Sequence, residues 1–234
     1  MRVANKFDFK QFTVYHDRCT MKVGTDSVLL GAWVELKNAQ RLLDVGTGSG
    51  VMALILAQRT STHSIIDAID IAKEDCEQAR ENIGRSPWPS KVNVHNQPLQ
   101  KFNAAPYDLI VSNPPYFNNS YKPPKATRIV ARHTQTLTHH DLLTHSKRLL
   151  KPSGRLNLIL PATEGSLIKL MAESEGWFNT RVCSFRSRSN KPVERLLLEF
   201  QLEKQNVRKE ELVLYKEVQE WSSEYYMLTK EFYL

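Results

Sequence analysis

Four consecutive residues, Asn113-Pro114-Pro115-Tyr116, are suited to holding a planar amine. They follow the apolar run Tyr107–Ser112, whose length and composition predict a buried strand. Proline lacks an amide hydrogen and fixes φ, so this turn is stiff and nearby carbonyl groups lack local donors. The side-chain oxygen of Asn113 and the carbonyl oxygen of Pro114 are expected to accept from one exocyclic amine, while Tyr116 stacks on the attached ring.

Such a turn addresses a specific chemical difficulty. The exocyclic nitrogen of adenine is a poor nucleophile because its lone pair is delocalised into the ring. Two acceptors localise that lone pair, and holding the nitrogen in line with a methyl donor contributes about 7–11 kcal/mol toward lowering the barrier. A base within a helix or stacked loop must first be flipped out to reach the turn. The motif therefore predicts a site at which an exocyclic amine acts as the nucleophile.

A glycine-rich turn forms the second candidate site. The apolar segment Arg41–Val45 leads through Gly46, Gly48 and Gly50 into an apolar helix. Glycine allows the backbone to approach a ligand, and a helix N-terminus presents unpaired amide hydrogens. The spacing lacks the last glycine of the dinucleotide fingerprint and the Lys-Ser/Thr pair of a P-loop, which argues against both of these nucleotide sites.

Two acidic residues flank the glycine turn. Asp70 ends the next predicted strand, where a carboxylate can accept from both ribose hydroxyls of a nucleoside cofactor. Asp44 precedes the glycines and is suited to binding an ammonium group, directly or through water. S-adenosylmethionine has both groups, so we expect it to be the cofactor. The alternative is a glycine loop that only turns the chain.

The elements that must position these residues alternate between strand length and helix length, which predicts a parallel sheet built from βαβ units. The predicted strands are Arg41–Val45, Ser64–Ile69, Val92–His95, Tyr107–Ser112 and Arg155–Leu160. The predicted helices are Val51–Gln58, Lys73–Gly84, Leu137–Leu150 and Glu164–Glu175. The first and fourth strands, which precede the two motifs, are expected to be neighbours at the switch point of a doubly wound sheet.

The remaining segments complete a Rossmann-like α/β fold with a seven-stranded, mostly parallel sheet that ends in an antiparallel hairpin. That hairpin is predicted at Asn179–Phe185 and Arg195–Leu202. A small hairpin at Phe7–Val23 and a short helix at Thr25–Leu36 precede the core, and Leu212–Leu234 is predicted to be a closing helix. Residues 1–36 are expected to cover the mouth of the site, and residues 37–234 to form the main domain of one structural unit.

The composition excludes several classes of protein. In 234 residues, 41% hydrophobic and 24% charged side chains indicate a folded globular chain rather than a disordered or fibrous one. The sequence contains no apolar run long enough to span a membrane and no signal peptide, so a cytoplasmic location is expected. Three scattered cysteines and seven histidines show no metal-ligand spacing, so we expect no metal.

An excess of basic residues indicates an anionic partner. Lysine and arginine outnumber acidic residues by 32 to 25, which gives a net charge of +7. Two basic segments are expected to flank the mouth and to contact RNA phosphates. The first consists of Lys122, Lys125, Arg128, Arg132 and His133, and the second of Arg181, Arg186, Arg188, Lys191 and Arg195. The sequence leaves the oligomeric state open and slightly favours a monomer.

Together, the glycine turn and the Asn-Pro-Pro-Tyr turn resemble those of the class I S-adenosylmethionine-dependent N-methyltransferases. Further segments are similar to the bacterial family that N6-methylates adenosine 37 of a valine tRNA. These segments are Phe9-Lys10-Gln11-Phe12, His16-Asp17-Arg18-Cys19, Met21-Lys22-Val23-Gly24-Thr25-Asp26, Leu29-Leu30-Gly31-Ala32-Trp33, Ser86-Pro87-Trp88 and Phe232-Tyr233-Leu234. The resemblance covers nearly the whole chain.

The resemblance implies site residues. The adenine would be held by Asn113, Pro114, Pro115 and Tyr116. The cofactor would be held by Gly24, Thr25, Asp26, Asp44, Gly46, Thr47, Gly48, Gly50, Asp70 and Ile71. After the third predicted strand the family often has an acidic residue, whereas this chain has Asn96 and Gln97, and which of them contacts the cofactor adenine stays open.

Several other functions remain alternatives. A protein glutamine N5-methyltransferase uses a similar turn on a side-chain amide, but it usually has a helical domain before its core. A DNA adenine-N6 enzyme usually has a target-recognition region, and a ribosomal guanine-N2 enzyme prefers Phe to the Tyr found at position 116. A nonenzymatic RNA-binding module is the alternative from another class.

Overall fold

The computed structural model describes residues 5–114, 137–217 and 220–234. Most of its strands form one nine-stranded sheet in the order β11-β10-β8-β9-β7-β6-β3-β4-β5. These strands are β3 (Arg41–Val45), β4 (Ile65–Asp70), β5 (Val92–Asn96), β6 (Tyr107–Ser112), β7 (Leu150–Pro161), β8 (Phe178–Arg188), β9 (Arg195–Gln201), β10 (Arg208–Glu217) and β11 (Glu220–Trp221).

The half of the sheet from β7 to β5 is parallel, as the alternating pattern predicts. β3 lies between β4 and β6, and Leu42 pairs with Ile66 on one side and with Leu109 on the other. The expected neighbourhood of the first and fourth predicted strands is therefore confirmed. β9 runs antiparallel to both β7 and β8, which confirms the predicted hairpin.

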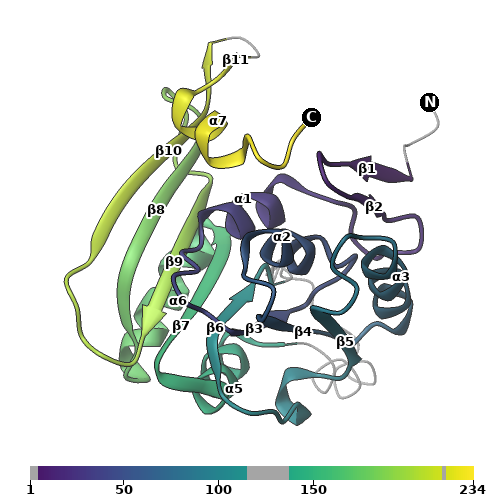
Figure 1. Cartoon of the computed structure of the whole chain (residues 1–234). Coiled ribbons are helices and arrows are strands. Elements are labelled where there is room, and N and C mark those ends of the chain that lie inside the picture. Colours follow the sequence, from purple (N-terminus) through teal and green to yellow (C-terminus); the bar gives the residue numbers. More distant parts are fainter. Residues whose placement is uncertain (1–4, 115–136, 218–219) are drawn as a thin grey trace, which may run out of the picture.

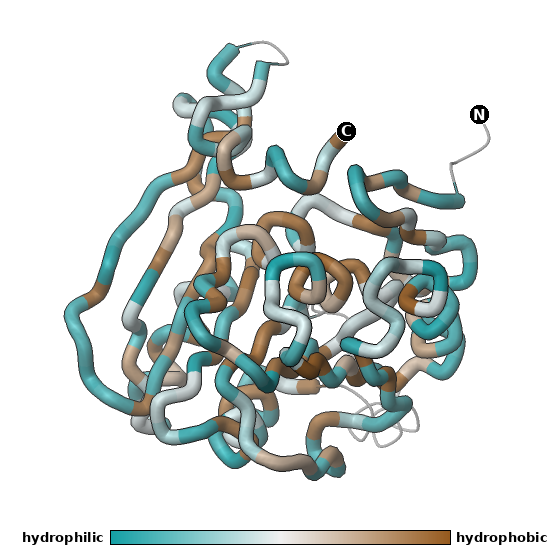
Figure 2. The backbone as a smooth tube through the Cα atoms, in the orientation of Figure 1, coloured by the Kyte–Doolittle hydropathy of each residue, from teal (hydrophilic) through white to brown (hydrophobic). Residues whose placement is uncertain are grey.

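Helices cover both faces of the sheet, because the central strands are apolar on both sides (Figures 1 and 2). One face packs against α1 (Thr25–Trp33), α2 (Val51–Arg59), α3 (Lys73–Gly84) and α7 (Ser223–Thr229). The other packs against the short helix η1 (Leu99–Lys101), α5 (His139–Leu149) and α6 (Ala162–Ser174). The α/β fold class is confirmed. No helix within the described ranges is both long and apolar enough to cross a bilayer.

The N-terminal segment forms the predicted small hairpin, from β1 (Lys6–Asp8) and β2 (Thr13–Tyr15). The Phe9 ring stacks on that of Phe12 with a centroid separation of 4.6 Å, and on that of Tyr233 at 6.1 Å. The hairpin and the C-terminal segment therefore pack against each other through aromatic rings, as their neighbouring positions in Figure 1 show.

The predicted closing helix is wrong in its first half. Residues 208–217 form β10 and residues 220–221 form β11, so only Ser223–Thr229 is helical in that segment. The sheet accordingly has nine strands rather than seven. β10 pairs with β8 along its length, so β8 is not left as an exposed edge with unpaired backbone groups.

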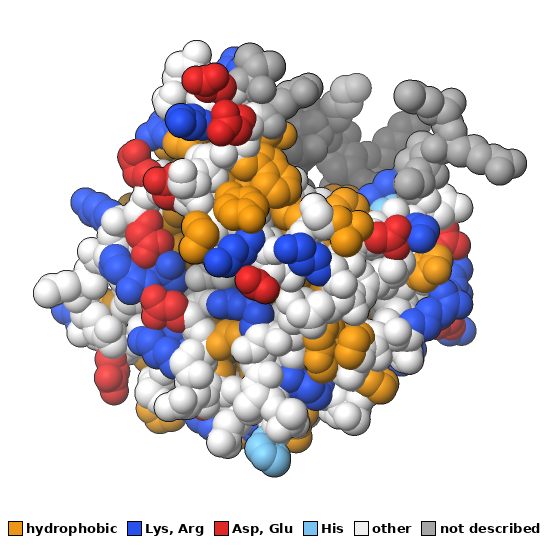
Figure 3. All heavy atoms as spheres, turned by 45° about the horizontal axis from the view of Figure 1, so that its top comes forward, with side chains coloured by type: hydrophobic (Ala, Val, Ile, Leu, Met, Phe, Trp, Pro, Cys, Tyr) orange, Lys and Arg blue, Asp and Glu red, His pale blue; other side chains and the backbone are white. Residues whose placement is uncertain are grey.

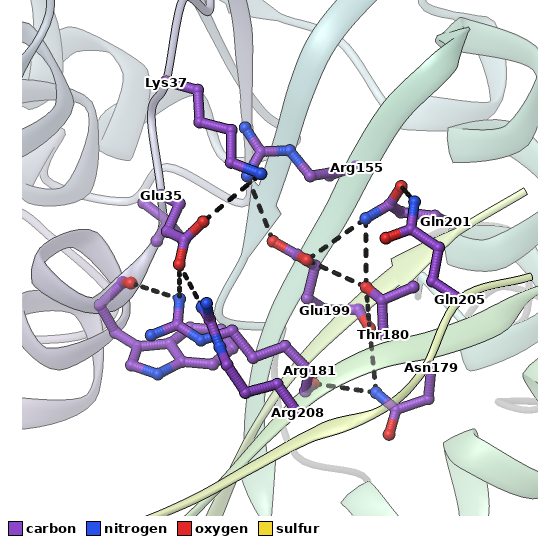
Figure 4. A network of polar contacts seen from close by, with 12 residues as sticks. Glu35, Lys37, Arg155, Asn179, Thr180, Arg181, Glu199, Gln201, Gln205 and Arg208 are labelled. Carbon is purple, nitrogen blue, oxygen red and sulfur yellow. Dashed lines mark hydrogen bonds and ion pairs between the residues drawn. The ribbon is translucent and has the colours of Figure 1, made fainter. Parts of the chain in front are cut away.

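Paired charges join the antiparallel strands to the rest of the fold (Figure 4). Arg155 on β7 and Glu199 on β9 are both buried and lie 3.3 Å apart. Arg181 on β8 lies 3.9 Å above the Trp33 ring and binds Glu210 at 2.8 Å. The prediction that Arg181 belongs to an RNA-binding segment is therefore wrong, because this guanidinium links α1 to β10 inside the fold.

Candidate active site

The glycine turn and Asn113, the first residue of the second motif, lie at the carboxyl ends of adjacent strands. Val45, the last residue of β3, pairs with Ser112, the last residue of β6. The Ser112 hydroxyl donates a hydrogen bond of 2.8 Å to the Val45 carbonyl oxygen and so holds the two strand ends together. The glycine turn and Asn113 therefore begin side by side, at the sheet edge where doubly wound folds bind their ligands.

The three glycines of the turn have positive φ values, which are strained for other residues. These φ values are 76° at Gly46, 52° at Gly48 and 82° at Gly50. A Cβ atom added at Gly46 or Gly48 would meet no atom of the described residues within 4 Å, whereas one at Gly50 would lie 3.2 Å from the Cβ of Ala79 on α3. Gly46 and Gly48 thus border open space, and Gly50 allows α2 to start close to α3.

Asp44 is fully buried and keeps one oxygen without a partner. Its Oδ2 accepts a 2.7 Å hydrogen bond from the Thr47 hydroxyl, while Oδ1 has no hydrogen-bond partner. The Ala53 backbone amide also approaches the carboxylate and lowers its pKa. Burial raises the pKa of Asp44 to about 7, against the opposing effect of the Thr47 hydrogen bond. An ammonium group beside Oδ1 would supply both the missing donor and the missing counter-charge.

Asp70 is joined to the glycine turn through its carboxylate. Its Oδ2 accepts from the Gly48 amide at 2.9 Å and its Oδ1 from the Ala72 amide at 3.0 Å. Burial raises the pKa of this carboxyl, against the effect of both amides. Each carboxylate oxygen has a further lone pair, so Asp70 can still accept from ribose hydroxyls.

Asn96, one of the two residues expected near the cofactor adenine, is held by its side-chain amide. Asn96 donates through Nδ2 to the carbonyl oxygens of Asp70 and Ile71, each at 3.0 Å. Because its amide hydrogens are used, its Oδ1 is the atom left to accept from an adenine amine. Gln97 and the Ile71 side chain are exposed beside it.

The side-chain oxygen of Asn113 is the atom that the sequence predicts to accept from the substrate amine. Its Nδ2 donates a 3.1 Å hydrogen bond to the Ser27 hydroxyl oxygen of α1. Its Oδ1 is buried and has no hydrogen-bond partner among the described residues. The other residues assigned to the turn and to the first basic segment lie outside the described residues; they are Pro115, Tyr116, Lys122, Lys125, Arg128, Arg132 and His133.

The start of α1 contacts the late hairpin. Gly24 is the N-cap residue of this helix and Thr25 is exposed. Asp26 in the first turn accepts a 2.8 Å hydrogen bond from Nε of Arg195 on β9. Sequence reasoning assigned Asp26 to the cofactor and Arg195 to RNA phosphate, but the two side chains bind each other. This ion pair fixes the first turn of α1 against the sheet.

The remaining basic residues of the late hairpin differ in their environments. Arg186 lies 3.4 Å from the Glu211 carboxylate, whereas Arg188 and Lys191 are exposed at the turn between β8 and β9. β9 runs antiparallel to both β7 and β8, so β8 has the same direction as β7 and this turn lies at the edge of the sheet where the parallel strands end. On the face in Figure 3, basic and acidic side chains are interspersed, so the positive charge there is not one continuous patch.

Sequence reasoning missed Asn82, a buried residue of α3. Its Oδ1 accepts from the Tyr15 amide at 2.9 Å, and its Nδ2 donates to the carbonyl oxygens of Tyr15 and Ser49 at 2.8 and 2.9 Å. It therefore connects the N-terminal hairpin to the glycine turn. The available signal was a polar residue at an inward position of a predicted helix, three residues after Ala79.

The described ranges contain no group of three or more His, Cys, Asp or Glu side chains that could hold a metal ion. The polar groups that converge at the strand ends are instead amides, carboxylates and hydroxyls. Such groups are suited to hydrogen bonding an ammonium group, a ribose and an amine.

Comparison with known proteins identifies the family. Residues 18–174 match the model of the "Methyltransferase small domain" family. Two relatives named tRNA1(Val) (adenine(37)-N6)-methyltransferase come from Tolumonas auensis and Bacteroides fragilis. The first is 42% identical over 99% of this chain and 98% of its own length, and the second 43% over 97% of each.

Solved structures agree on the fold. A predicted O-methyltransferase from Agrobacterium tumefaciens superposes with a TM-score of 0.70 at 15% identity, over 88% of this chain and 96% of its own. A methyltransferase from Pyrococcus furiosus gives a TM-score of 0.56 at 22% identity, over 81% and 88%. The class I methyltransferase fold implies S-adenosylmethionine as the methyl donor. The chain belongs to the methyltransferase small domain family and, within it, to the family of the tRNA1(Val) (adenine(37)-N6)-methyltransferases.

Proposed function

We propose that this protein transfers the methyl group of S-adenosylmethionine to N6 of adenosine 37 in tRNA1(Val). One observation carries the proposal: Asp44 and Asn113, at the ends of adjacent strands, each have a buried oxygen for which the described part of the chain provides no hydrogen-bond partner. Buried acceptors without donors are costly, so both positions suit a ligand that donates. The names of the relatives supply the substrate in this proposal.

The residues around the glycine turn fit the cofactor. Oδ1 of Asp44 would accept from the ammonium group of the cofactor. The space beside Gly46 and Gly48 would allow the cofactor to lie against the backbone of the turn. Asp70 would accept from the ribose hydroxyls, and Oδ1 of Asn96 from the adenine amine. When bound, the cofactor supplies an electrophilic methyl group on a sulfonium.

Asn113 and Pro114 would prepare the nucleophile. Oδ1 of Asn113 and the Pro114 carbonyl oxygen each accept one hydrogen from the adenine N6 amine, which localises its lone pair and fixes its direction. N6 would gain the methyl group, S-adenosylhomocysteine would leave, and N6 would lose one proton to solvent. Positioning of the amine, rather than a charged base, lowers the barrier.

The N-terminal segment would act as the cover of this site. In the proposed division, residues 1–36 form the cover and residues 37–234 the main domain. Asn82 connects the two, because its side chain is hydrogen-bonded to Tyr15 of the cover and to Ser49 of the glycine turn. Arg18 adds an ion pair with Glu81 on the same helix. A tRNA substrate would place the activity in the cytoplasm.

Labelled cofactor provides the test. The purified protein is incubated with methyl-labelled S-adenosylmethionine and total RNA from cells that lack the corresponding activity, and the RNA is digested to nucleosides. We expect the label in N6-methyladenosine, and expect it to disappear when a tRNA1(Val) transcript has guanosine at position 37. Label only in N2-methylguanosine, or only in protein, would contradict the proposal and would favour the rRNA or glutamine alternative respectively.

A further inference from the structure

We infer that residues 21–24 form a strap across the cofactor site and that Asp75 is the positioning residue that holds this strap in place. The inference rests on the proposed function, because it concerns how the site at the glycine turn retains S-adenosylmethionine. Its basis is a hydrogen bond between residues 55 positions apart, in which the Thr20 backbone amide donates to Oδ1 of Asp75 at 2.8 Å.

The strap starts beside the carboxylate proposed to bind ribose. Asp75 lies in the first turn of α3, the helix that follows Asp70 at the end of β4. Burial raises the pKa of Asp70, and the nearby charge of Asp75 adds to this effect. Burial also raises the pKa of the Cys19 thiol, and the carboxylates of Asp75 and Asp70 both add to it. The chain at Cys19 and Thr20 therefore lies close to Asp70.

The strap ends beside the proposed substrate site. Ser27, in the first turn of α1, lies 3.1 Å from Nδ2 of Asn113, which follows β6. β3 lies between β4 and β6, so the chain from Thr20 to Ser27 spans two strand spacings, about 9–10 Å, past the end of β3. The glycine turn begins at that end. The strap thus passes the cofactor site from its ribose side to its substrate side.

The face of α3 that holds the N-terminal segment is polar. It contains three buried residues at helical spacing, namely Asp75, Gln78 and Asn82. Oε1 of Gln78 accepts from Nε of Arg18 at 3.3 Å, and Asn82 binds the Tyr15 backbone. The chain from Tyr15 to Thr20 therefore follows α3 toward its first turn, where Asp75 fixes the point at which the strap leaves the helix.

The contact at Asp75 has only one polarity. A backbone amide can donate but not accept, and a carboxylate oxygen accepts. Hydrogen bonds to charged groups are stronger than those between neutral groups, and the Asp75 side chain is buried, so water competes little for it. Loss of this side chain should therefore release Thr20 from α3.

The strap itself is mostly exposed to solvent. Its exposed residues are Met21, Lys22 and Gly24. The Val23 amide donates to Nδ1 of His16 at 3.5 Å, but both residues belong to the N-terminal segment, so this bond does not tie the strap to α3. The position of the strap over the glycine turn therefore depends on its two ends, at Asp75 and at the start of α1.

The first test compares Asp75→Ala with Asp75→Asn, which keeps an oxygen that can accept from the Thr20 amide. We expect the dissociation rate of S-adenosylhomocysteine, measured by stopped flow, to rise by about 10- to 100-fold in Asp75→Ala, the range for loss of a hydrogen bond to a charged group. The association rate should change by less than about threefold, because an opened strap does not obstruct entry. Asp75→Asn should restore most of the slow dissociation.

The loss of charge cannot explain faster dissociation. The charge of Asp75 disfavours the ionised form of Asp70, so its removal alone would favour the carboxylate that binds ribose. Glu74→Ala is the matched control, because Glu74 carries the same charge in the same turn of α3 but is exposed. We expect its dissociation rate to equal that of the wild type.

The second test uses trypsin and needs no variant. Lys22 is an exposed cleavage site within the strap. Saturating S-adenosylhomocysteine should slow cleavage after Lys22 in the wild type by at least about tenfold, because a bound cofactor holds the strap closed. Mass spectrometry of the fragments identifies this cleavage. In Asp75→Ala the protection should be clearly smaller.

The outcomes separate the inference from the proposed function. A wild-type protein that does not bind S-adenosylhomocysteine contradicts the proposed function and the inference with it. A wild type that binds it, but whose dissociation rate is unchanged by Asp75→Ala or rises equally in Glu74→Ala, overturns only the inference. Equal cleavage after Lys22 with and without S-adenosylhomocysteine also overturns it, whatever the stability of the variants, because the strap would then not cover the cofactor.

Discussion

The backbone amide of Gly48 donates a 2.9 Å hydrogen bond to the Asp70 carboxylate, and this joins the glycine turn to the end of β4. The loop and the carboxylate proposed to bind ribose are therefore one connected unit. We therefore expect a substitution in the glycine turn to displace the Asp70 carboxylate, and a substitution of Asp70 to remove a hydrogen bond that holds the turn.

Gly48→Ala should weaken cofactor binding more than it weakens the fold. Its positive φ costs about 1–2 kcal/mol for a residue with a Cβ, and that Cβ would enter the open space beside the turn. We expect the affinity for S-adenosylhomocysteine, measured by calorimetry, to fall more than about tenfold. Gly50→Ala is the matched control, because its Cβ would meet Ala79 and should lower the melting temperature more. Wild-type affinity in Gly48→Ala would remove Gly48 from the cofactor site.

Asn113→Ala should separate binding from transfer. The substitution removes the amine acceptor but leaves Asp44 and Asp70 untouched, so cofactor affinity should stay within about twofold of the wild type. Methyl transfer to tRNA should fall by at least about 100-fold, the effect typical of removing one preorganised polar group from a reacting centre. Single-turnover assays with labelled cofactor measure this. Unchanged turnover would exclude Asn113 from the mechanism.

The sequence predicted what depends on neighbours in the chain. A strand followed by glycines, or by Asn113 and Pro114, specifies a strand end and a turn locally, and parallel strands place their carboxyl ends at one edge. The sequence did not predict the contact of Ser27 with Asn113 or of Asn82 with Tyr15. These join residues 86 and 67 positions apart and depend on the packing of whole helices.

The C-terminal segment was mispredicted for a related reason. Its aromatic and apolar residues fit a helix as well as a strand, and only pairing decides between them. Leu212 is buried and paired with Phe185, so the segment became β10 because β8 offered an open edge. The residues of this segment alone do not show that β8 has an unpaired edge, because that edge exists only in the folded sheet.

Asp44 should make stability and cofactor affinity depend on pH in opposite directions. Its pKa rises from 3.8 in the unfolded chain to about 7 in the folded protein, so the folded state binds more protons between these values. Without cofactor, stability should therefore decrease as the pH rises from about 4 to 7. An ammonium ligand favours the carboxylate, so binding should release a proton below pH 7 and affinity should rise by about one logarithmic unit per pH unit.

Asp44→Asn tests this assignment. Melting temperatures without cofactor should fall less between pH 4 and 7 in the variant than in the wild type, and Asp70, whose pKa is also raised, accounts for the part that persists. Calorimetric titration with S-adenosylhomocysteine in buffers of different ionisation enthalpy measures the released proton. Equal proton release by both proteins would assign the titration to a group other than Asp44.

Asn82→Ala should destabilise the attachment of the N-terminal hairpin. It removes two part-buried hydrogen bonds to the Tyr15 backbone and one buried hydrogen bond to the Ser49 carbonyl, at a cost of about 2–4 kcal/mol. Glu81, the residue before Asn82 on α3, makes solvent-accessible ion pairs with Arg18 and Arg85, and Glu81→Ala should cost less than about 1 kcal/mol. Urea unfolding compares the two. An equal loss of unfolding free energy in both variants would mean that the buried hydrogen bonds of Asn82 do not hold the hairpin more strongly than the exposed ion pairs of Glu81.

Arg188 and Lys191 should contribute to tRNA binding through charge alone. Both are exposed at the turn between β8 and β9, so replacing both with Gln should leave the melting temperature unchanged while weakening tRNA binding. Each lost phosphate contact should reduce the slope of log affinity against log salt concentration by about 0.7–0.9. The control is the replacement of Lys204 and Lys209 with Gln. These two exposed lysines lie at or just before the start of β10, at the edge of the sheet opposite to the β8–β9 turn, and their replacement removes the same charge. If both pairs flatten the salt dependence equally, net charge rather than the β8–β9 turn governs binding, because position in the fold would then have no effect.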